Sequence, residues 1–385
     1  MTLKVAVFTG TRAEYGLLRY LLTDLQEKNE IEVRLIVSGS HLSPEFGYTV
    51  AEIESDGFRV DEKVEILLSS STKVGVAKSL GLGTMSFAET LDRLKPDVLI
   101  VLGDRYEALA MAQAALMLEI PIAHLHGGEI SRGSLDDSIR HMITKASALH
   151  FVSNEQHRQR VIQMGESPSR VFNVGALVCD HVLRTSRATR SVLTEKFDFD
   201  FSVPFCMLTY HPSAFSEEDP QETLRNIFQA LQVFPNLNVV ATYPNADAGG
   251  KEIIGALREA SELLGSKMLL VESLGIENYH RAIEASMLVI GNSSSGIIEA
   301  PFFRTPSVNV GSRQIGRVAA TSVIHSGTSV EEITRAIGKA VEVSWDQVTN
   351  PYFNGGSTSK AIVELLLSSN LESKKVFFDI VSEVL

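Results

Sequence analysis

The stretch DVLIVLGDRYEALAMAQAALMLEIPIAHLHGGEIS, residues 97–131, decides the fold of this 385-residue chain. Two apolar runs, each short enough to be a buried strand, flank a segment rich in alanine and leucine that favours a helix. A strand, a helix and a second strand in this order predict a βαβ unit with parallel strands. Both runs end in polar groups, Gly103, Asp104 and Arg105 after the first and His124, His126 and Glu129 after the second.

The rest of the chain alternates in the same way between short apolar runs and longer amphipathic segments. Runs such as KVAVFTG and FCMLTYHPS favour strands, while EYGLLRYLLTDLQEKN carries apolar residues at helical spacing. Continuous apolar strands separated by helices predict parallel sheets covered on both faces. We therefore predict an α/β protein with two Rossmann-like, doubly wound domains facing a cleft, an N-terminal domain over 1–177 and a C-terminal domain over 178–365. A final helix over 366–385 is expected to pack back on the first domain.

Composition narrows the class of protein. A net charge of -12 gives no support to nucleic-acid or anionic-membrane binding, which needs a basic surface. Two cysteines cannot form a disulfide framework, which favours a reducing compartment. The N-terminus runs directly into a strand without the apolar region of a signal peptide, and no apolar run is long enough to span a membrane. We expect a cytoplasmic protein with neither nucleic acid nor membrane as a partner.

The first candidate binding site is FTGTRAEYG, residues 8–16. A strand that ends in Gly-Thr-Arg before a helix places backbone N–H groups and the guanidinium of Arg12 at one point, which suits a phosphate. An ordinary turn with a surface arginine is the alternative. The segment is not the G-x-G-x-x-G fingerprint, so we expect no nicotinamide cofactor.

The second candidate is GNSSSGIIEAP, residues 291–301, again a strand, a small polar turn and a helix. Ser293 and Ser294 offer amides and hydroxyls to a phosphate, and Glu299 can accept hydrogen bonds from the two hydroxyls of a ribose. Arg313 and Arg317, in GSRQIGR, add positive charge, although either side chain could simply be solvated.

The third candidate is an acid–base group. Carboxylates and imidazoles at strand ends can abstract and donate protons. Its members are Asp104, His126, Glu129, Asp136 and His211, with Arg105 beside them. Metal binding is the alternative for the histidines and acids, but H-x-H on a strand has no third ligand at a suitable spacing. His124 or His126 alone could be a core histidine, and Asp137 could cap the following helix.

Several motifs in this order resemble those of the hydrolysing UDP-N-acetylglucosamine 2-epimerases over residues 4–365. They are GTRAEYG, LGDRYEALA, HLHGGE, DDSIRHMITK, HPS, GNSSSGIIEAP and SRQIGR. The resemblance implies the glycosyltransferase-B architecture, with the nucleotide held mainly by the second domain. It also implies a homodimer or homotetramer, no cofactor and no metal, and a place in sialic or legionaminic acid biosynthesis.

The resemblance also implies roles for single residues. Arg12, Arg317, Ser293 and Ser294 would contact the diphosphate, and Glu299 the ribose. Asp104 would be a catalytic carboxylate with Arg105 beside it at the substrate, Asp136 a second catalytic acid, and His211 a group that reaches the diphosphate or the sugar. The animal and some bacterial members carry glutamate where this chain has His126, whereas many bacterial members share the histidine. His126 and Glu129 are therefore the two candidates for the role assigned to that glutamate.

The implied reaction explains why such groups are needed. A base removes the C2 proton of the acetamido sugar while UDP leaves C1, and water then adds with protonation of C2 from the opposite face. The substrate would be UDP-N-acetylglucosamine or UDP-N,N'-diacetylbacillosamine, and the sequence does not choose between them. The alternatives are a glycosyltransferase of the same architecture, a non-hydrolysing epimerase and a non-catalytic nucleotide-sugar sensor. The acids and histidines of the third candidate favour an epimerase over a transferase or a sensor. The motifs GDRYEALA, HGGE and SRQIGR favour the hydrolysing branch of the epimerases.

Overall fold

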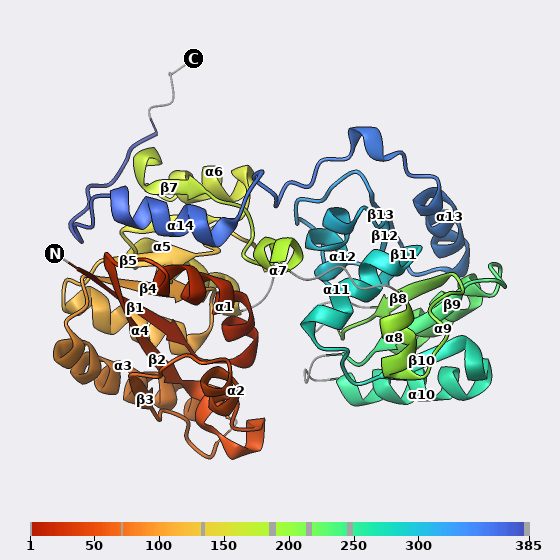
Figure 1. Cartoon of the computed structure of the whole chain (residues 1–385), viewed down its shortest axis with the longest axis horizontal. Coiled ribbons are helices and arrows are strands. Elements are labelled where there is room, and N and C mark those ends of the chain that lie inside the picture. The colour runs from red at the N-terminus through yellow and green to blue at the C-terminus, as the bar shows by residue number, and fades with distance from the viewer. Residues whose placement is uncertain are drawn as a thin grey trace. The chain divides into compact units, whose positions relative to one another are not determined.

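The computed structural model describes residues 2–70, 72–131, 135–184, 190–212, 218–244 and 249–380. The chain divides into two compact units, Met1–Asp180 with Tyr352–Leu385, and His181–Pro351. Each unit contains one parallel β-sheet with helices on both of its faces (Figure 1). This confirms the predicted α/β fold class with two Rossmann-like domains. Residues 352–365, which the sequence prediction placed in the second domain, belong to the first unit.

The first unit is built on a seven-stranded sheet with the order β3-β2-β1-β4-β5-β6-β7. Its strands are β1 (Leu3–Thr9), β2 (Ile31–Ser38), β3 (Glu62–Val64), β4 (Val98–Leu102), β5 (Ile122–Leu125), β6 (Leu149–Val152) and β7 (Val171–Asn173). Its helices are α1 (Arg12–Gln26), α2 (Val50–Ser55), α3 (Lys73–Leu94), α4 (Tyr106–Met117), α5 (Leu135–Ala146), α6 (Glu155–Gln163) and α14 (Thr358–Ser368), and α7 (Val178–Arg184) leads into the second unit.

Alternating side chains of β1 show how the sheet is covered on both faces. Val5 and Val7 belong to one buried cluster, which contains residues of α1 and α14. Ala6 and Phe8 belong to another, which contains residues of α3, α4 and α5. Burial on both faces explains why the strands read as continuous apolar runs.

The second unit has a six-stranded sheet with the order β10-β9-β8-β11-β12-β13. Its strands are β8 (Phe205–Thr209), β9 (Asn238–Thr242), β10 (Met268–Val271), β11 (Leu288–Gly291), β12 (Ser307–Val310) and β13 (Val323–Ser326). Its helices are α8 (Arg190–Phe197), α9 (Pro220–Leu231), α10 (Gly250–Leu264), α11 (Ile276–Ala285), α12 (Ser295–Ile298) and α13 (Val330–Val341). The sequence prediction missed β3 and β13, because three- and four-residue edge strands carry little apolar signal.

The last helix differs from the prediction. A helix was expected over 366–385, but α14 ends at Ser368 and residues 369–380 form no helix, while residues 381–385 lie outside the described residues. This segment is held by tertiary contacts instead, because Lys375 Nζ donates to Ser147 O at 2.7 Å and Phe378 N donates to Gly165 O at 3.0 Å. The contacts of residues 369–380 with the rest of the first unit therefore outweigh the helical propensity of this segment.

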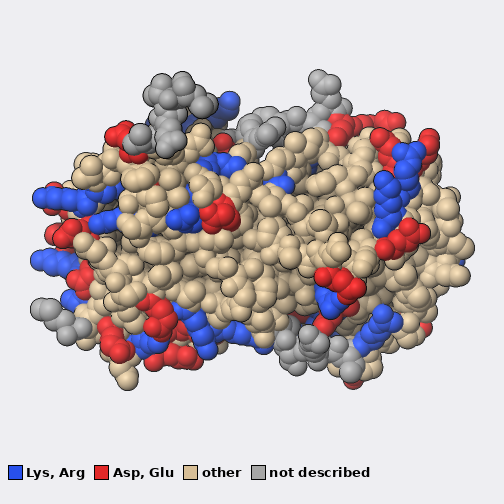
Figure 2. Space-filling model, turned by 90° about the horizontal axis from the view of Figure 1, so that it is seen from above, with Lys and Arg blue, Asp and Glu red and all other residues tan. Residues whose placement is uncertain are grey.

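The charged side chains are mixed in sign. On the face shown in Figure 2, acidic and basic residues lie interspersed around a broad uncharged area. This distribution agrees with the net charge of -12 and differs from the continuous basic surface of nucleic-acid-binding proteins.

Candidate active site

The carboxyl ends of β4 and β5 lie side by side, since Leu102 of β4 pairs with Leu125 of β5. His124 ties the two ends together: its Nε2 lies 2.8 Å from Gly103 O and its Nδ1 lies 3.1 Å from Thr144 Oγ1. Burial lowers the pKa of His124 to about 3, so this ring is neutral at pH 7. His124 is therefore a satisfied core histidine, as one of the two sequence interpretations held.

Asp104 is anchored by Arg140 of α5. The guanidinium of Arg140 is buried and donates through Nη2 to Asp104 Oδ2 and, at 3.1 Å, to Ser131 Oγ. Through Nη1 it donates to Glu129 O at 2.9 Å. Arg140 thus joins the carboxylate of Asp104, two residues after β4, to the backbone of Glu129 in the loop after β5.

His126 and Glu129 form a direct pair. His126 has a φ of 62°, a left-handed conformation that costs a residue other than glycine roughly 1–2 kcal/mol. Its backbone N–H donates to Phe151 O at 2.9 Å, which helps to hold it there. Its Nε2 accepts from Leu177 N at 3.3 Å, so the ring proton of the neutral form lies on Nδ1, which is 3.2 Å from Glu129 Oε1. The protonated nitrogen of His126 therefore lies beside the carboxylate of Glu129.

A buried histidine and a serine support Glu129 from α6 and the segment before it. The Asn154 side chain accepts from His157 N through Oδ1, so its Nδ2 donates to His157 Nε2. The proton of neutral His157 then lies on Nδ1, 2.8 Å from Ser153 Oγ, and the Ser153 hydroxyl donates to Glu129 Oε1 at 3.0 Å. Glu129 thus receives a hydrogen bond from Ser153 and lies beside the imidazole of His126.

Gly128 must be a glycine in this loop. Its φ is 77°, and a Cβ at this position would lie 2.5 Å from His157 O. Arg160 of α6 donates to Gly128 O from the same side. The close approach of α6 fixes the loop that carries His126 and Glu129.

The two adjacent acids of α5 differ in position. Asp136 is exposed on the first turn of the helix. Asp137 is half-buried, accepts from Ser131 N at 2.7 Å and lies 3.6 Å from Arg140 Nη1. Asp137 therefore belongs to the network around Arg140.

Arg12 and Arg105 occupy different surroundings at the edge of the same sheet. Arg12 begins α1, is largely exposed, and pairs with Glu52 through Nε at 2.9 Å. Arg105 contacts both carboxylate oxygens of buried Glu107 at 3.2 Å. Burial raises the pKa of nearby Glu14 to about 7, and the negative charge of Glu107 adds to this effect.

In the second unit, His211 follows β8 and is held through its backbone. Asn292, directly after β11, accepts from His211 N at 2.6 Å and donates to His211 O at 2.8 Å. Arg313 Nη1 and Gln314 Nε2 donate to Asn292 O at 3.0 and 2.8 Å. Burial, followed by the charge of Arg313, lowers the pKa of His211 to about 4, so His211 is neutral at pH 7.

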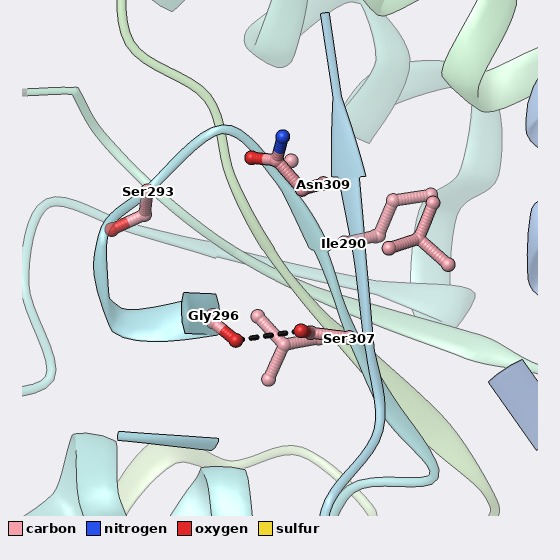
Figure 3. A pocket seen from close by; sticks show the side chains of 8 residues that line it. Ile290, Ser293, Gly296, Ser307 and Asn309 are labelled. Carbon is pink, nitrogen blue, oxygen red and sulfur yellow. Dashed lines mark hydrogen bonds between the residues drawn. The ribbon is translucent and has the colours of Figure 1, made fainter. Parts of the chain in front are cut away.

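The serine turn after β11 is organised by Tyr279 of α11. Its hydroxyl lies 2.6 Å from Ser295 Oγ, which is 3.0 Å from Ser293 Oγ. Ser294 precedes the first residue of the short helix α12. A small cavity opens between this turn and β12, where Ser307 Oγ donates to Gly296 O at 2.6 Å (Figure 3). It is lined by residues 289–291, 293, 296 and 307–309.

Glu299 follows α12, and its Oε2 lies 2.9 Å from Nε2 of buried His280. Arg317 is half-buried in the loop after β12 that also carries Arg313. The second unit thus brings Ser293, Glu299 and Arg313 onto neighbouring segments around β11.

Sequence reasoning missed the residues that support these groups. They are Ser131, Arg140, Ser153, His157, Tyr279, His280 and Asn292. Only Arg140 had a visible signal, because it lies three residues after Asp137 on a predicted helix. The described residues contain no group of three or more His, Cys, Asp or Glu side chains that could hold a metal ion. Within the same residues, every helix is too short or too polar to cross a membrane.

Comparison with known proteins establishes the family. A family model described as UDP-N-acetylglucosamine 2-epimerase matches residues 23–367. The chain belongs to this family. Membership confirms the predicted resemblance and identifies the chain as an enzyme of this group.

Curated relatives of this epimerase family member cover most of the chain. It is 37% identical to the GDP/UDP-N,N'-diacetylbacillosamine 2-epimerase (hydrolyzing) of Campylobacter jejuni, with 87% of each chain covered. It is 35% identical to the UDP-N,N'-diacetylbacillosamine 2-epimerase (hydrolyzing) of Legionella pneumophila, with 97% of this chain and 98% of the relative covered. A solved UDP-GlcNAc 2-epimerase from Neisseria meningitidis, bound to UDP-GlcNAc, has a TM-score of 0.80 at 20% identity, with 95% of this chain and all of that chain covered. This likeness confirms the glycosyltransferase-B-like fold class.

Proposed function

We propose that this enzyme is a hydrolysing 2-epimerase of a UDP-2-acetamido sugar, which releases UDP and the free manno-configured sugar. The observation that carries the proposal is the arrangement of Asp104 and Glu129. Their segments are joined by the buried guanidinium of Arg140, and His126 Nδ1 lies 3.2 Å from Glu129 Oε1. Two carboxylates and an imidazole at adjacent strand ends provide the acid and the base that C2 inversion requires.

The reaction divides into two steps. In the first, a base takes the C2 proton, the C2–H electrons form the C1=C2 double bond, and the C1–O bond breaks to release UDP. In the second, water adds its hydroxyl to C1 while an acid protonates C2 from the opposite face. We assign one proton transfer to the His126–Glu129 pair and the other to Asp104, with Asp136 as a second acid. Comparing Asp136→Asn with Asp137→Asn would test which of the two acids of α5 takes part.

The second unit would bind the nucleotide. In the proposal, Ser293 and Ser294 contact the diphosphate, Glu299 binds the ribose, and Arg313 and Arg317 lie near the phosphates. Positive charge at this point stabilises the leaving UDP.

Arg12, Arg105 and His211 would complete the contacts to the substrate. Arg12 would contact the diphosphate, and because it pairs with Glu52 in this structure it must exchange that carboxylate for the substrate. Arg105 would lie at the sugar beside Asp104. His211, which is neutral at pH 7, would donate a hydrogen bond to the diphosphate or the sugar.

We propose UDP-N,N'-diacetylbacillosamine as the substrate, which gives 2,4-diacetamido-2,4,6-trideoxymannose for legionaminic acid biosynthesis. The support is that the relatives at 37% and 35% identity carry that substrate in their names, whereas the Neisseria meningitidis serogroup B relative named UDP-N-acetylglucosamine 2-epimerase is 30% identical. The second candidate is UDP-N-acetylglucosamine, which gives N-acetylmannosamine for sialic acid biosynthesis.

Proton NMR of each UDP-sugar with the enzyme in D₂O tests the reaction. Free UDP and a manno sugar deuterated at C2 are expected, and the faster substrate identifies the sugar. An intact UDP-sugar without exchange at C2 would contradict the proposal and favour a transferase or a sensor.

Substitutions test the individual roles. Asp104→Asn should abolish turnover while UDP still binds, and loss of UDP binding would remove Asp104 from proton transfer. Glu299→Ala should weaken UDP binding. His126→Ala and Glu129→Gln, compared in the same assay, show which member of the pair is indispensable.

The proposal includes a homodimer or homotetramer in the cytoplasm. Apolar side chains exposed at the end of α4, among them Met117 at 75% exposure, support an interface on the first unit. Light scattering after size exclusion tests this, and a monomer at micromolar concentration would contradict it.

A further inference from the structure

Helix α11 holds both ends of the short helix α12. Its Tyr279 hydroxyl lies 2.6 Å from Oγ of Ser295, the first residue of α12. The next residue, His280, places Nε2 at 2.9 Å from Oε2 of Glu299, the residue after α12. Two consecutive side chains of one helix therefore fix the serine turn and the carboxylate.

The surroundings of His280 determine which of its ring nitrogens carries the proton. The ring is 1% exposed, and its Nδ1 has no hydrogen-bond partner within the described part of the chain. A buried N–H without an acceptor is more costly than a nitrogen lone pair without a donor, so the ring proton lies on Nε2 and is donated to Glu299. Phe303, whose ring centre is 5.4 Å from that of His280, packs against the ring and restricts its rotation.

This contact leaves the two oxygens of Glu299 in different situations. Oε2 accepts from His280, whereas Oε1 makes no hydrogen bond to any residue that the structure describes. A carboxylate held at one oxygen has a defined direction at the other, which lowers the entropy lost when it binds a hydroxyl.

We propose that His280 is a positioning residue for ribose recognition, which orients Glu299 so that Oε1 accepts from a ribose hydroxyl of the nucleotide. The inference rests on the proposed function in one respect, the assignment of Glu299 to the ribose. It assigns the selection of ribo- over deoxyribonucleotides to the His280–Glu299 pair.

Isothermal titration with UDP, 2′-deoxy-UDP and 3′-deoxy-UDP tests the proposal in the full-length protein. The wild type should bind at least one deoxy analogue about ten- to a hundredfold more weakly than UDP, the range expected for a lost hydrogen bond to a charged group. His280→Gln keeps an N–H near the position of Nε2 and should keep most of this ratio. His280→Asn is one methylene shorter, cannot reach Glu299, and should reduce the ratio to about threefold or less.

Two further variants show whether the role of His280 or the assignment of Glu299 to the ribose is wrong. Phe303→Leu removes packing from the ring but no hydrogen bond, so it should lower the melting temperature and leave the ratio unchanged. Glu299→Ala should abolish the ratio. If it does, and His280→Asn still discriminates as the wild type does, the role of His280 is refuted while the ribose assignment stands. If Glu299→Ala retains the ratio, the ribose assignment fails and the inference about His280 fails with it.

Discussion

Glu166 anchors the C-terminal segment, and its substitution gives a sharp test of the electrostatics of the first unit. Its carboxylate is 2% exposed and lies 2.6 Å from Lys145 Nζ, 2.7 Å from Lys375 Nζ and 3.2 Å from His150 Nε2. Burial by itself raises the pKa of Glu166, but hydrogen bonds from His150, Lys145 and Lys375 lower it to about 2. Glu166→Gln keeps the shape of the side chain and removes its charge.

The loss in free energy of unfolding expected for Glu166→Gln can be calculated in two ways. A carboxyl whose pKa falls from 4.5 to about 2 on folding stabilises the ionised native state by about 3 kcal/mol. Removing one partner of a buried ion pair costs about 3–5 kcal/mol. Because the folded pKa is the lower one, this stabilisation is present above pH 4.5 and is lost as the pH falls toward 2. Glu166→Gln should therefore destabilise the first unit by about 3 kcal/mol at pH 7, and by much less at pH 3.

A matched control separates burial from charge. Glu364 forms a comparable contact with Lys28 at 2.5 Å, but the two side chains are 66% and 37% exposed. Glu364→Gln should cost about 0–1 kcal/mol because the pair is solvated. Urea unfolding followed by circular dichroism measures both losses. Trp345 is the single tryptophan and lies in the second unit, so its fluorescence reports whether that unit is affected.

Two outcomes would refute the reasoning. One is a Glu166→Gln variant that stays within 1 kcal/mol of Glu364→Gln at pH 7. The other is a difference from wild type that does not shrink between pH 6 and pH 3.

Three further predictions concern groups near the candidate site. Burial and Arg313 keep His211 neutral, with a pKa of about 4, and the negative diphosphate of bound UDP should raise that pKa. UDP binding at pH 6 should therefore take up a fraction of a proton, which calorimetry in buffers of different ionisation enthalpy measures. His211→Asn should abolish that uptake. Burial raises the pKa of Glu14 above its unfolded value, so ionisation of Glu14 destabilises the native state as pH rises through 4.5–7. Glu14→Gln should therefore raise the free energy of unfolding by about 1–3 kcal/mol at pH 8 and by little at pH 4.5. An equal increase at both pH values would contradict this. Arg140→Lys cannot span the three acceptors of Arg140 and should lower the turnover number at least tenfold with UDP still bound. Arg158 of α6 donates instead to Val171 O and Pro168 O, so Arg158→Lys should leave turnover unchanged.

Local sequence patterns were sufficient for the architecture. The stretch over residues 97–131 predicted β4, α4 and β5, and the structure contains all three. Apolar runs of strand length separated by amphipathic segments carry this information because burial on both faces of a sheet demands it. The C-terminal helix was predicted too long because helical propensity does not register the docking of Lys375 and Phe378 on the first unit.

The candidate site was only half visible from the sequence. Residues at strand ends, such as Asp104, His126 and His211, could be proposed because parallel strands bring their carboxyl ends to one edge of a sheet. Their supporting partners could not, because Ser153 and His280 lie 24 and 19 residues from the side chains they contact, on segments with ordinary helix or strand patterns.

The sequence by itself determined the two parallel sheets, the family and the polar groups that end each strand, since these depend on local hydropathy and on motif order. The tertiary structure alone decided which acids share Arg140, which nitrogen of His126 carries the proton, and which oxygen of Glu299 is already engaged. These properties depend on distances of about 3 Å between atoms far apart in the chain, and only the packed fold sets such distances.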